Sequence, residues 1–294
     1  MSKSLTYSLR GIAVILVIIS HFAGGGFGIR YFTPLGGIGV SIFLFLSGFG
    51  LQESYRKNGL KLFWPKRLIR IIVPYLIWVV LLFLLSRVLE YDAPLFPHYW
   101  YLDYLFLWYA LFWLSKFLPS KYSPLFLLLV AFSLFFVLRN IQAEQSLSFL
   151  GGMLLSENKQ VLDKWKRSSW SRIAFVCIVF GIGCLAIKQL PTCRSFGEES
   201  ILMKIIQLGI KLPLGLSVII VMWMFFKENS LYRCLASIGV ISLELYLVQM
   251  QFWQFIQGSW RNLLIALLIV AALSLILHYF TGIVSRKVLA LWEK

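Results

Sequence analysis

The chain has 294 residues, of which 60% are hydrophobic and 17% aromatic, whereas soluble domains are ~45–50% apolar. Its formal net charge is +16, but the cations fall mainly between apolar runs, as they do in the cytoplasmic loops of membrane proteins. This pattern excludes an ordinary soluble domain and argues against nucleic-acid binding. The four cysteines form no Cys-x-x-Cys pair, so neither a disulfide framework nor a metal site is predicted.

The first apolar segment runs from Arg10 to His21 through aliphatic residues. On an α-helix these two side chains share a face roughly 16 Å apart along the axis. If Arg10 lies at a membrane surface, His21 falls near the middle of a ~30 Å hydrocarbon core. Ionisable groups at that depth usually face a bundle interior or a wet cavity and carry function. A histidine that only hydrogen-bonds between helices is the alternative.

The pattern of apolar runs predicts an all-α, polytopic transmembrane bundle of about ten membrane-spanning helices. The predicted spans are roughly 11–29, 34–54, 71–89, 99–116, 123–138, 146–156, 173–188, 205–226, 234–256 and 262–284. Most lysines and arginines then fall in the even-numbered connections and at the two ends, which places both termini in the cytoplasm. Residues 1–294 are expected to form a single integral-membrane domain.

Two of these segments have weaker signals. Residues 146–156 are short, and their adjacent glycines suit close helix packing better than an independent span. Residues 201–212 are expected to lie on the outer surface, with the true span starting at Pro213, because polar side chains share one face. Those side chains are Lys204, Gln207 and Lys211.

The connection between the second and third spans is the most basic stretch. Pro65 suits the first turn of a helix, and Arg67 and Arg70 would then be neighbours at i, i+3, next to Lys66. Guanidinium groups fork well onto phosphates, so a phosphorylated ligand would dock here. Lipid-headgroup contact together with topology signalling is the alternative, and charge alone favours it.

Polar residues also occur inside later apolar runs. Placing the carboxylate of Glu244 inside a membrane without a partner costs free energy, so we expect it to meet a cation or a polar cavity. His278 is predicted to be interfacial, near the cytoplasmic end of the last span. The aromatic cluster of residues 91–101 is expected at the outer surface, where interfacial anchoring is commoner than stacking on sugars.

Six blocks then follow one another along nearly the whole chain. They are Leu9-Arg10-Gly11-Ile12-Ala13 leading to His21, Gly39–Phe49, Lys66–Tyr75, Tyr99–Leu102, Phe149–Gly152 and Gly239–Val248. In this order, and with ten residues between the arginine and the histidine, they resemble the acyltransferase-3 family of integral-membrane acyltransferases.

The resemblance implies a ten-helix bundle that passes acyl groups, usually acetyl from cytoplasmic acetyl-CoA, to hydroxyls of extracytoplasmic glycans. His21 matches the family's essential histidine, and Arg10 matches its paired cation. Arg67 and Arg70 match arginines of the cytoplasmic loop. Gln249 departs from the pattern, because many members carry a histidine there, so no base is expected at this position and its role is left open.

We therefore expect an O-acyltransferase, multi-pass in the cytoplasmic membrane of a bacterium, that acts on a cell-surface or lipid-linked saccharide. An imidazole with an ordinary pKa of ~6.5 suits the removal of a hydroxyl proton. The catalytic candidate is His21, as that base or as a transient acyl carrier. The donor-binding candidates are Arg10, Lys66, Arg67 and Arg70, and the supporting polar candidates are Ser47, Asp103 and Glu244.

The expected partners are acyl-CoA as the donor substrate, a saccharide acceptor, membrane lipid and envelope-glycan assembly proteins. No permanently bound cofactor and no nucleic acid are expected. A transporter or flippase of lipid-linked saccharides would use the same cations to grip a pyrophosphate, but the sequence lacks paired halves with matching broken helices. A membrane scaffold or sensor would leave the spacing of Arg10 and His21 unexplained.

Overall fold

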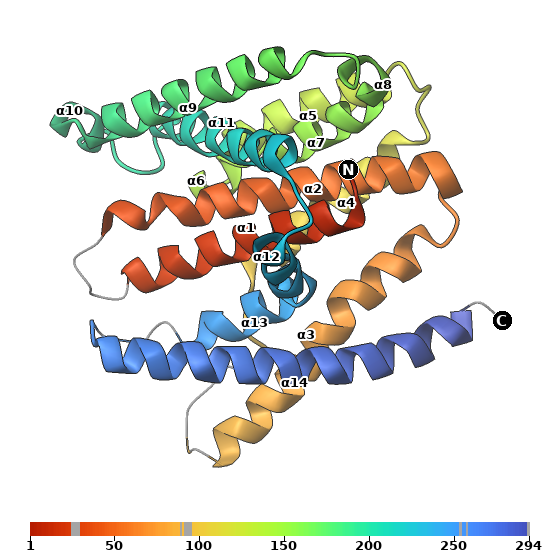
Figure 1. Ribbon diagram of the computed structural model, residues 1–294, viewed down its shortest axis with the longest axis vertical. Helices are drawn as coiled ribbons and strands as arrows, with labels where there is room; N and C mark the ends of the chain where they lie inside the picture. The colour runs from red at the N-terminus through yellow and green to blue at the C-terminus, as the bar shows by residue number, and fades with distance from the viewer. Residues whose placement is uncertain (25–29, 89, 91–95, 253–254, 257, 293–294) are drawn as a thin grey trace. The chain divides into compact units, whose positions relative to one another are not determined.

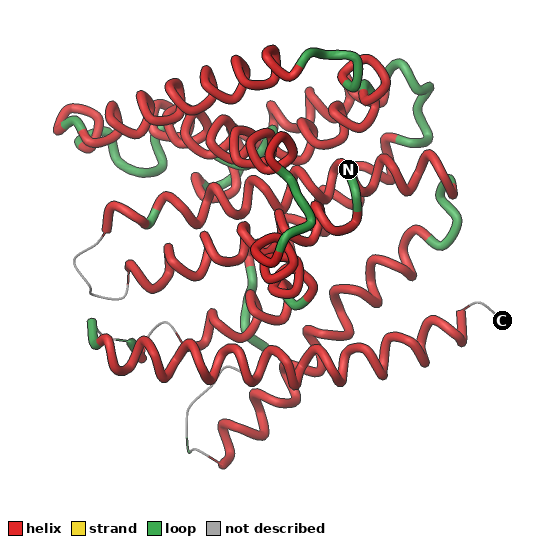
Figure 2. The backbone as a smooth tube through the Cα atoms, in the orientation of Figure 1, coloured by secondary structure: helices red, strands yellow, loops and turns green. Residues whose placement is uncertain are grey.

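The computed structural model describes residues 1–24, 30–88, 90, 96–252, 255–256 and 258–292, and the regular structure in these ranges is helical (Figures 1 and 2). The predicted all-α class is confirmed. The elements are α1 (Lys3–Gly24), η1 (Arg30–Phe32), α2 (Pro34–Asn58), α3 (Phe63–Val88), α4 (Trp100–Ser115), α5 (Ser123–Val137), α6 (Asn140–Ala143), α7 (Ser148–Glu157), α8 (Lys159–Leu162), α9 (Arg167–Gln189), α10 (Pro191–Arg194), α11 (Ile201–Phe225), α12 (Ser230–Val240), α13 (Ser242–Phe252) and α14 (Trp260–Trp292).

Each of the ten predicted spans contains a helix, which confirms a polytopic helical bundle. In the described part of the chain, six helices are long and apolar enough to cross a membrane: α1, α2, α3, α9, α11 and α14. The pair α12 and α13, bent by 69°, makes a seventh if it acts as one broken span. The helices α4, α5 and α7 have 16, 15 and 10 residues. At 1.5 Å per residue they are shorter than a ~30 Å hydrocarbon core.

The chain folds into two compact units that alternate along the sequence. Unit 1 comprises Met1–Val17, Pro34–Gly59 and Tyr104–Gly239. Unit 2 comprises Ile18–Thr33, Leu60–Asp103 and Val240–Lys294. Each unit has its own buried apolar cluster, around Leu9 and Ile42 in unit 1 and around Phe22 and Ile256 in unit 2.

In unit 1, α2 and α7 approach each other backbone to backbone. A Cβ atom added at Gly152 would lie 1.9 Å from the carbonyl oxygen of Phe45, and one at Gly48 would lie 2.0 Å from that of Phe149. Only glycine permits this approach, because any side chain would overlap the facing backbone. The interpretation of the short segment 146–156 as a packing element is therefore confirmed.

The prediction for residues 201–212 is wrong. The helix α11 runs without a break through Pro213, and the three polar side chains of its first half are buried. Lys204 Nζ donates to the carbonyl oxygen of Leu138 at 2.6 Å, and Lys211 Nζ lies 3.5 Å from Glu144 Oε1. The polar face looked like that of a surface helix because its partners lie about sixty residues earlier in the chain.

In unit 2, α14 packs against both α3 and α13 (Figure 1). The predicted last span ended at residue 284, but the helix continues to Trp292. His278 therefore lies well inside the helix, while its position near the cytoplasmic end of the membrane span stays a prediction, because the end of a helix does not mark a membrane surface. The polar residues that follow the apolar run, including Arg286, remain helical; the guanidinium Nε of Arg286 donates to the carbonyl oxygen of Gly282 at 2.9 Å.

The contact between α2 and α7 generates a matched pair of substitutions. Gly152→Ala should lower the free energy of unfolding by about 1–3 kcal/mol, as overpacking does. Gly151→Ala should leave it unchanged or raise it slightly, because a Cβ there would lie 3.4 Å from Phe45 Cε2, in ordinary contact, and alanine favours helix. Thermal unfolding of the purified proteins in detergent measures both effects. Equal thermal unfolding midpoints for the two variants would contradict the close backbone contact between α2 and α7.

Candidate active site

His21 lies in the last turn of α1, in the part of the helix that belongs to unit 2. Its Nδ1 atom lies 2.9 Å from Oε1 of Gln249 on α13. An amide oxygen can only accept, so Nδ1 carries the proton and donates it. The Nε2 atom of His21 is then left with a lone pair, which is the form that a general base or a nucleophile needs.

Gln249 holds this imidazole from inside the protein. Its side chain is fully buried, so the amide is kept in place by its surroundings. Its Nε2 group has no hydrogen-bond partner in the described part of the chain. Because an unpaired buried donor is costly, this amide is retained at the expense of stability. That cost is typical of a residue placed for function.

The α13 helix that carries Gln249 is fixed to α3 through Tyr99. The Tyr99 hydroxyl donates to the carbonyl oxygen of Leu247 at 2.8 Å and accepts from Trp78 Nε1 at 2.9 Å. The ring of Tyr99 also packs against Tyr246, with 5.8 Å between the ring centroids. Rotation or sliding of α13 would break these contacts, so Tyr99 limits the movement of the amide that orients His21.

This position of Tyr99 corrects the prediction for the aromatic cluster. Tyr99 and Tyr101 are buried rather than placed at the outer surface. Phe96 is exposed, as predicted, and Tyr91 lies outside the described residues. Sequence alone did not separate the two cases, because aromatic rings at a membrane interface and aromatic rings that close a helix contact have the same composition.

Glu244 forms a second polar contact on α13. It is buried, and its Oε1 atom lies 2.9 Å from Nδ1 of His278 on α14. The expectation that Glu244 meets a group able to carry positive charge is confirmed. His278, which is predicted to be interfacial, is thus the partner of this carboxylate. The pair links α13 to α14.

The predicted cations of unit 2 share the first turns of α3. The guanidinium of Arg67 lies 4.4 Å from the centre of the Phe63 ring and donates to the Phe63 carbonyl oxygen at 3.2 Å. Lys66 and Arg70 are exposed. Arg10 belongs to unit 1, on the same helix α1 as His21, with its guanidinium 5.8 Å from the centre of the Tyr7 ring.

The remaining polar candidates lie in different settings. Ser47 is partly buried on α2, next to the packing residue Gly48. Asp103 Oδ2 lies 2.7 Å from His98 Nε2, and both side chains are mostly exposed. Asp103 therefore pairs with a surface histidine, which leaves Gln249 as the polar partner of His21. The sequence leaves the role of Gln249 open because it replaces a histidine. Its place in that motif, inside an apolar span, is the signal that points to it.

These features define a polytopic helical membrane protein with a half-buried histidine whose tautomer is set by a buried amide. The profile of the acyltransferase-3 family, described as an acyltransferase domain, matches residues 8–285. The chain belongs to this family and is a membrane acyltransferase. No curated protein and no solved structure matches the chain.

The contact between His21 and Gln249 can be tested directly, because the chain has three histidines. In protein labelled with ¹⁵N-histidine, the His21 signals, assigned by their loss in His21→Ala, should show a protonated Nδ1 and an unprotonated Nε2. Gln249→Leu should produce a mixture of tautomers and reduce acyl transfer about ten- to a hundredfold, as for loss of a hydrogen bond to a group that becomes charged. Gln249→Glu keeps the acceptor and should restore the tautomer.

The matched control is Gln251→Leu, on the same helix, whose Nε2 lies 3.4 Å from the Tyr99 hydroxyl. It should leave the His21 tautomer unchanged. A Gln249→Leu protein with the wild-type tautomer and wild-type activity would show that the amide does not orient His21.

Proposed function

We propose that the protein is an O-acyltransferase that moves an acyl group, most simply acetyl, from cytoplasmic acyl-CoA to a hydroxyl of a cell-surface or lipid-linked saccharide. The proposed location is the cytoplasmic membrane of a bacterium. The observation that carries the proposal is the 2.9 Å contact between His21 Nδ1 and Gln249 Oε1, in a chain that belongs to a membrane acyltransferase family.

Acyl transfer to an alcohol requires removal of the hydroxyl proton as the oxygen attacks. In the proposed reaction His21 Nε2 takes that proton while the alcohol oxygen bonds to the thioester carbonyl carbon. The carbon–sulfur bond then breaks, and the CoA thiolate leaves with the proton from His21. Gln249 Oε1 supports the step because it continues to accept from Nδ1–H when the ring becomes positively charged.

The same geometry also supports a covalent route. In that route His21 Nε2 attacks the thioester carbonyl itself and CoA leaves as the thiolate. The saccharide oxygen then bonds to the acyl carbon as the bond from that carbon to Nε2 breaks, and the hydroxyl proton passes to the CoA thiolate. Both routes need an unprotonated Nε2, which the Gln249 contact provides. A test of His21 therefore addresses the proposal whichever route operates.

We propose that the CoA phosphates bind to the cations at the start of α3. Arg67 is held by Phe63, whereas Lys66 and Arg70 are exposed beside it, so three positive charges lie within two helical turns. A guanidinium group can donate two parallel hydrogen bonds to one phosphate. Arg10 is the remaining donor-binding candidate. The excess of cations in this connection and at the chain ends supports a cytoplasmic position, which is the side on which acyl-CoA is available.

A transporter of lipid-linked saccharides remains the alternative function, and one observation favours it. The 69° bend between α12 and α13 resembles the discontinuous helices that line substrate sites in transporters. Membership of an acyltransferase family favours the enzyme. Transfer of label from acyl-CoA to the saccharide separates the two, because a transporter would move the saccharide without modifying it.

His21→Ala should abolish transfer of label from [¹⁴C]acetyl-CoA to a saccharide acceptor, with insertion and abundance near normal. General acid–base catalysis typically accelerates a reaction ~10²–10⁴-fold, and the variant loses this acceleration. The control is His98→Ala, because His98 is an exposed residue paired with Asp103, and it should retain wild-type transfer. Substantial transfer by His21→Ala at wild-type protein levels would reduce His21 to a structural residue.

Arg67→Ala and Arg70→Ala should each weaken acetyl-CoA binding about ten- to a hundredfold, since each removes a charge-assisted hydrogen bond. Affinity for the saccharide should stay unchanged. Titration of acetyl-CoA into the purified proteins in nanodiscs measures this, and Arg87→Ala, at the other end of α3, is the control. Equal acetyl-CoA affinity in all four proteins would mean that these arginines serve topology alone.

A further inference from the structure

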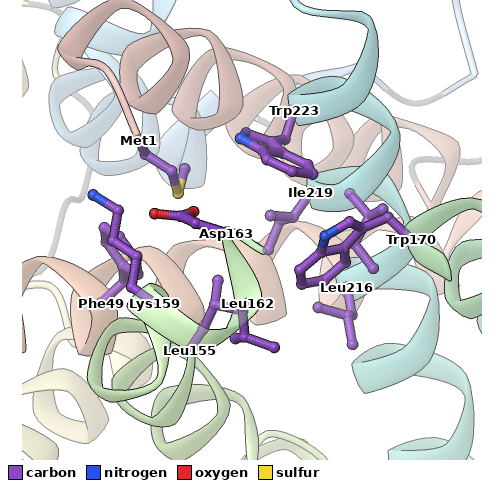
Figure 3. A pocket seen from close by; sticks show the side chains of 11 residues that line it. Met1, Phe49, Leu155, Lys159, Leu162, Asp163, Trp170, Leu216, Ile219 and Trp223 are labelled. Carbon is purple, nitrogen blue, oxygen red and sulfur yellow. The ribbon is translucent and has the colours of Figure 1, made fainter. Parts of the chain in front are cut away.

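Unit 1 contains an apolar pocket that the acyl-transfer proposal does not use (Figure 3). It lies where α9 begins and α11 ends, beside the short helix α8 and the end of α7. Its walls include Leu155, Leu162, Trp170, Leu216, Ile219 and Trp223. Lys159 and Asp163 are the charged side chains among the residues that line it.

The pocket lies at the ends of two membrane-spanning helices. Both α9 and α11 are long and apolar enough to cross a membrane. Arg167, the first residue of α9, donates to the carbonyl oxygen of Met224, next to the last residue of α11, at 3.0 Å. Trp165 and Trp223 are partly exposed here, as tryptophans at the level of lipid headgroups commonly are. A ligand of this pocket would therefore meet it at a membrane surface.

The size and lining of the pocket favour an alkyl chain. Its cavity volume is about 60 Å³, less than half of the ~150 Å³ of a cavity that holds benzene. A segment of a hydrocarbon chain fits a cavity of this size and apolar lining. The lining residue Trp170 is buried, and its Nε1 group has no hydrogen-bond partner in the described residues.

The charges around the pocket favour a negatively charged head group. Lys159 lines the pocket, and Lys164, Lys166 and Arg167 follow it within eight residues. Asp163 is the acidic residue of this stretch. Lysines next to the end of a membrane-spanning helix, here the start of α9, attract anionic lipids.

We propose that this pocket binds an anionic glycerophospholipid, with part of one acyl chain between Leu162 and Leu216 and the phosphate against Lys159. The apolar walls and the cation thus correspond to the chain and the phosphate of one molecule. The proposal does not depend on the acyl-transfer reaction and is tested without measuring it.

The test is native mass spectrometry of the purified full chain in detergent, titrated with dioleoylphosphatidylglycerol or dioleoylphosphatidylcholine. The wild-type protein should bind one phosphatidylglycerol about fivefold or more tightly than phosphatidylcholine. Leu162→Trp fills the pocket and should weaken phosphatidylglycerol binding at least tenfold. Lys159→Gln should remove most of the preference for phosphatidylglycerol, since one lysine near an anionic headgroup accounts for about fivefold in affinity.

Each variant has a matched control on the same unit. Val161→Trp adds the same ring at the neighbouring exposed position of α8, and Lys121→Gln removes a lysine outside the pocket. Both should bind as the wild type does. Equal binding by Leu162→Trp and Val161→Trp would overturn the proposal, as would equal binding of the two lipids by the wild type. Displacement of the lipid by palmitoyl-CoA at equal concentration would also overturn it, by assigning the pocket to an acyl-CoA.

Discussion

The cost of an unpaired polar group in an apolar interior is the constraint on which this structure depends. The imidazole of His21 can lie among apolar side chains of a candidate membrane-spanning helix because Gln249 accepts its Nδ1 proton. The same requirement explains why Glu244 meets His278 and why Lys211 meets Glu144. In each case the two partners come from different segments of the chain, so pairing a polar side chain also fixes a contact between those segments.

Close backbone packing provides the second support, because hydrocarbon chains surrounding a membrane protein reduce the hydrophobic gain from helix association. Gly48 and Gly152 bring α2 and α7 together in unit 1. In unit 2, Tyr99 provides a comparable restraint through hydrogen bonds, since it joins α13 to α3. The first restraint is steric and the second is made of hydrogen bonds. Each opposes the sliding of one helix along another, which would move functional side chains.

The sequence by itself determined the class of fold and the principal candidate residue. Long apolar runs predicted a polytopic helical bundle, because a helix is the simplest way to satisfy backbone groups in lipid. The spacing of Arg10 and His21 predicted a histidine placed for function, since each turn of a helix has a fixed rise. Glycines in a short apolar segment predicted close packing. All of these inferences use local geometry, which a single stretch of sequence contains.

Only the tertiary structure decided which distant residues meet. The polar face of α11 looked like a membrane-surface helix until its partners at residues 138–144 were placed against it. The sequence left the role of Gln249 open because an amide is not a base, and its contact with His21 depends on residues 228 positions apart in the chain. Burial of Tyr99 and the pairing of His278 were hidden in the same way. The contacts of Gln249, Lys204 and His278 each join residues more than thirty positions apart, and no local periodicity encodes them.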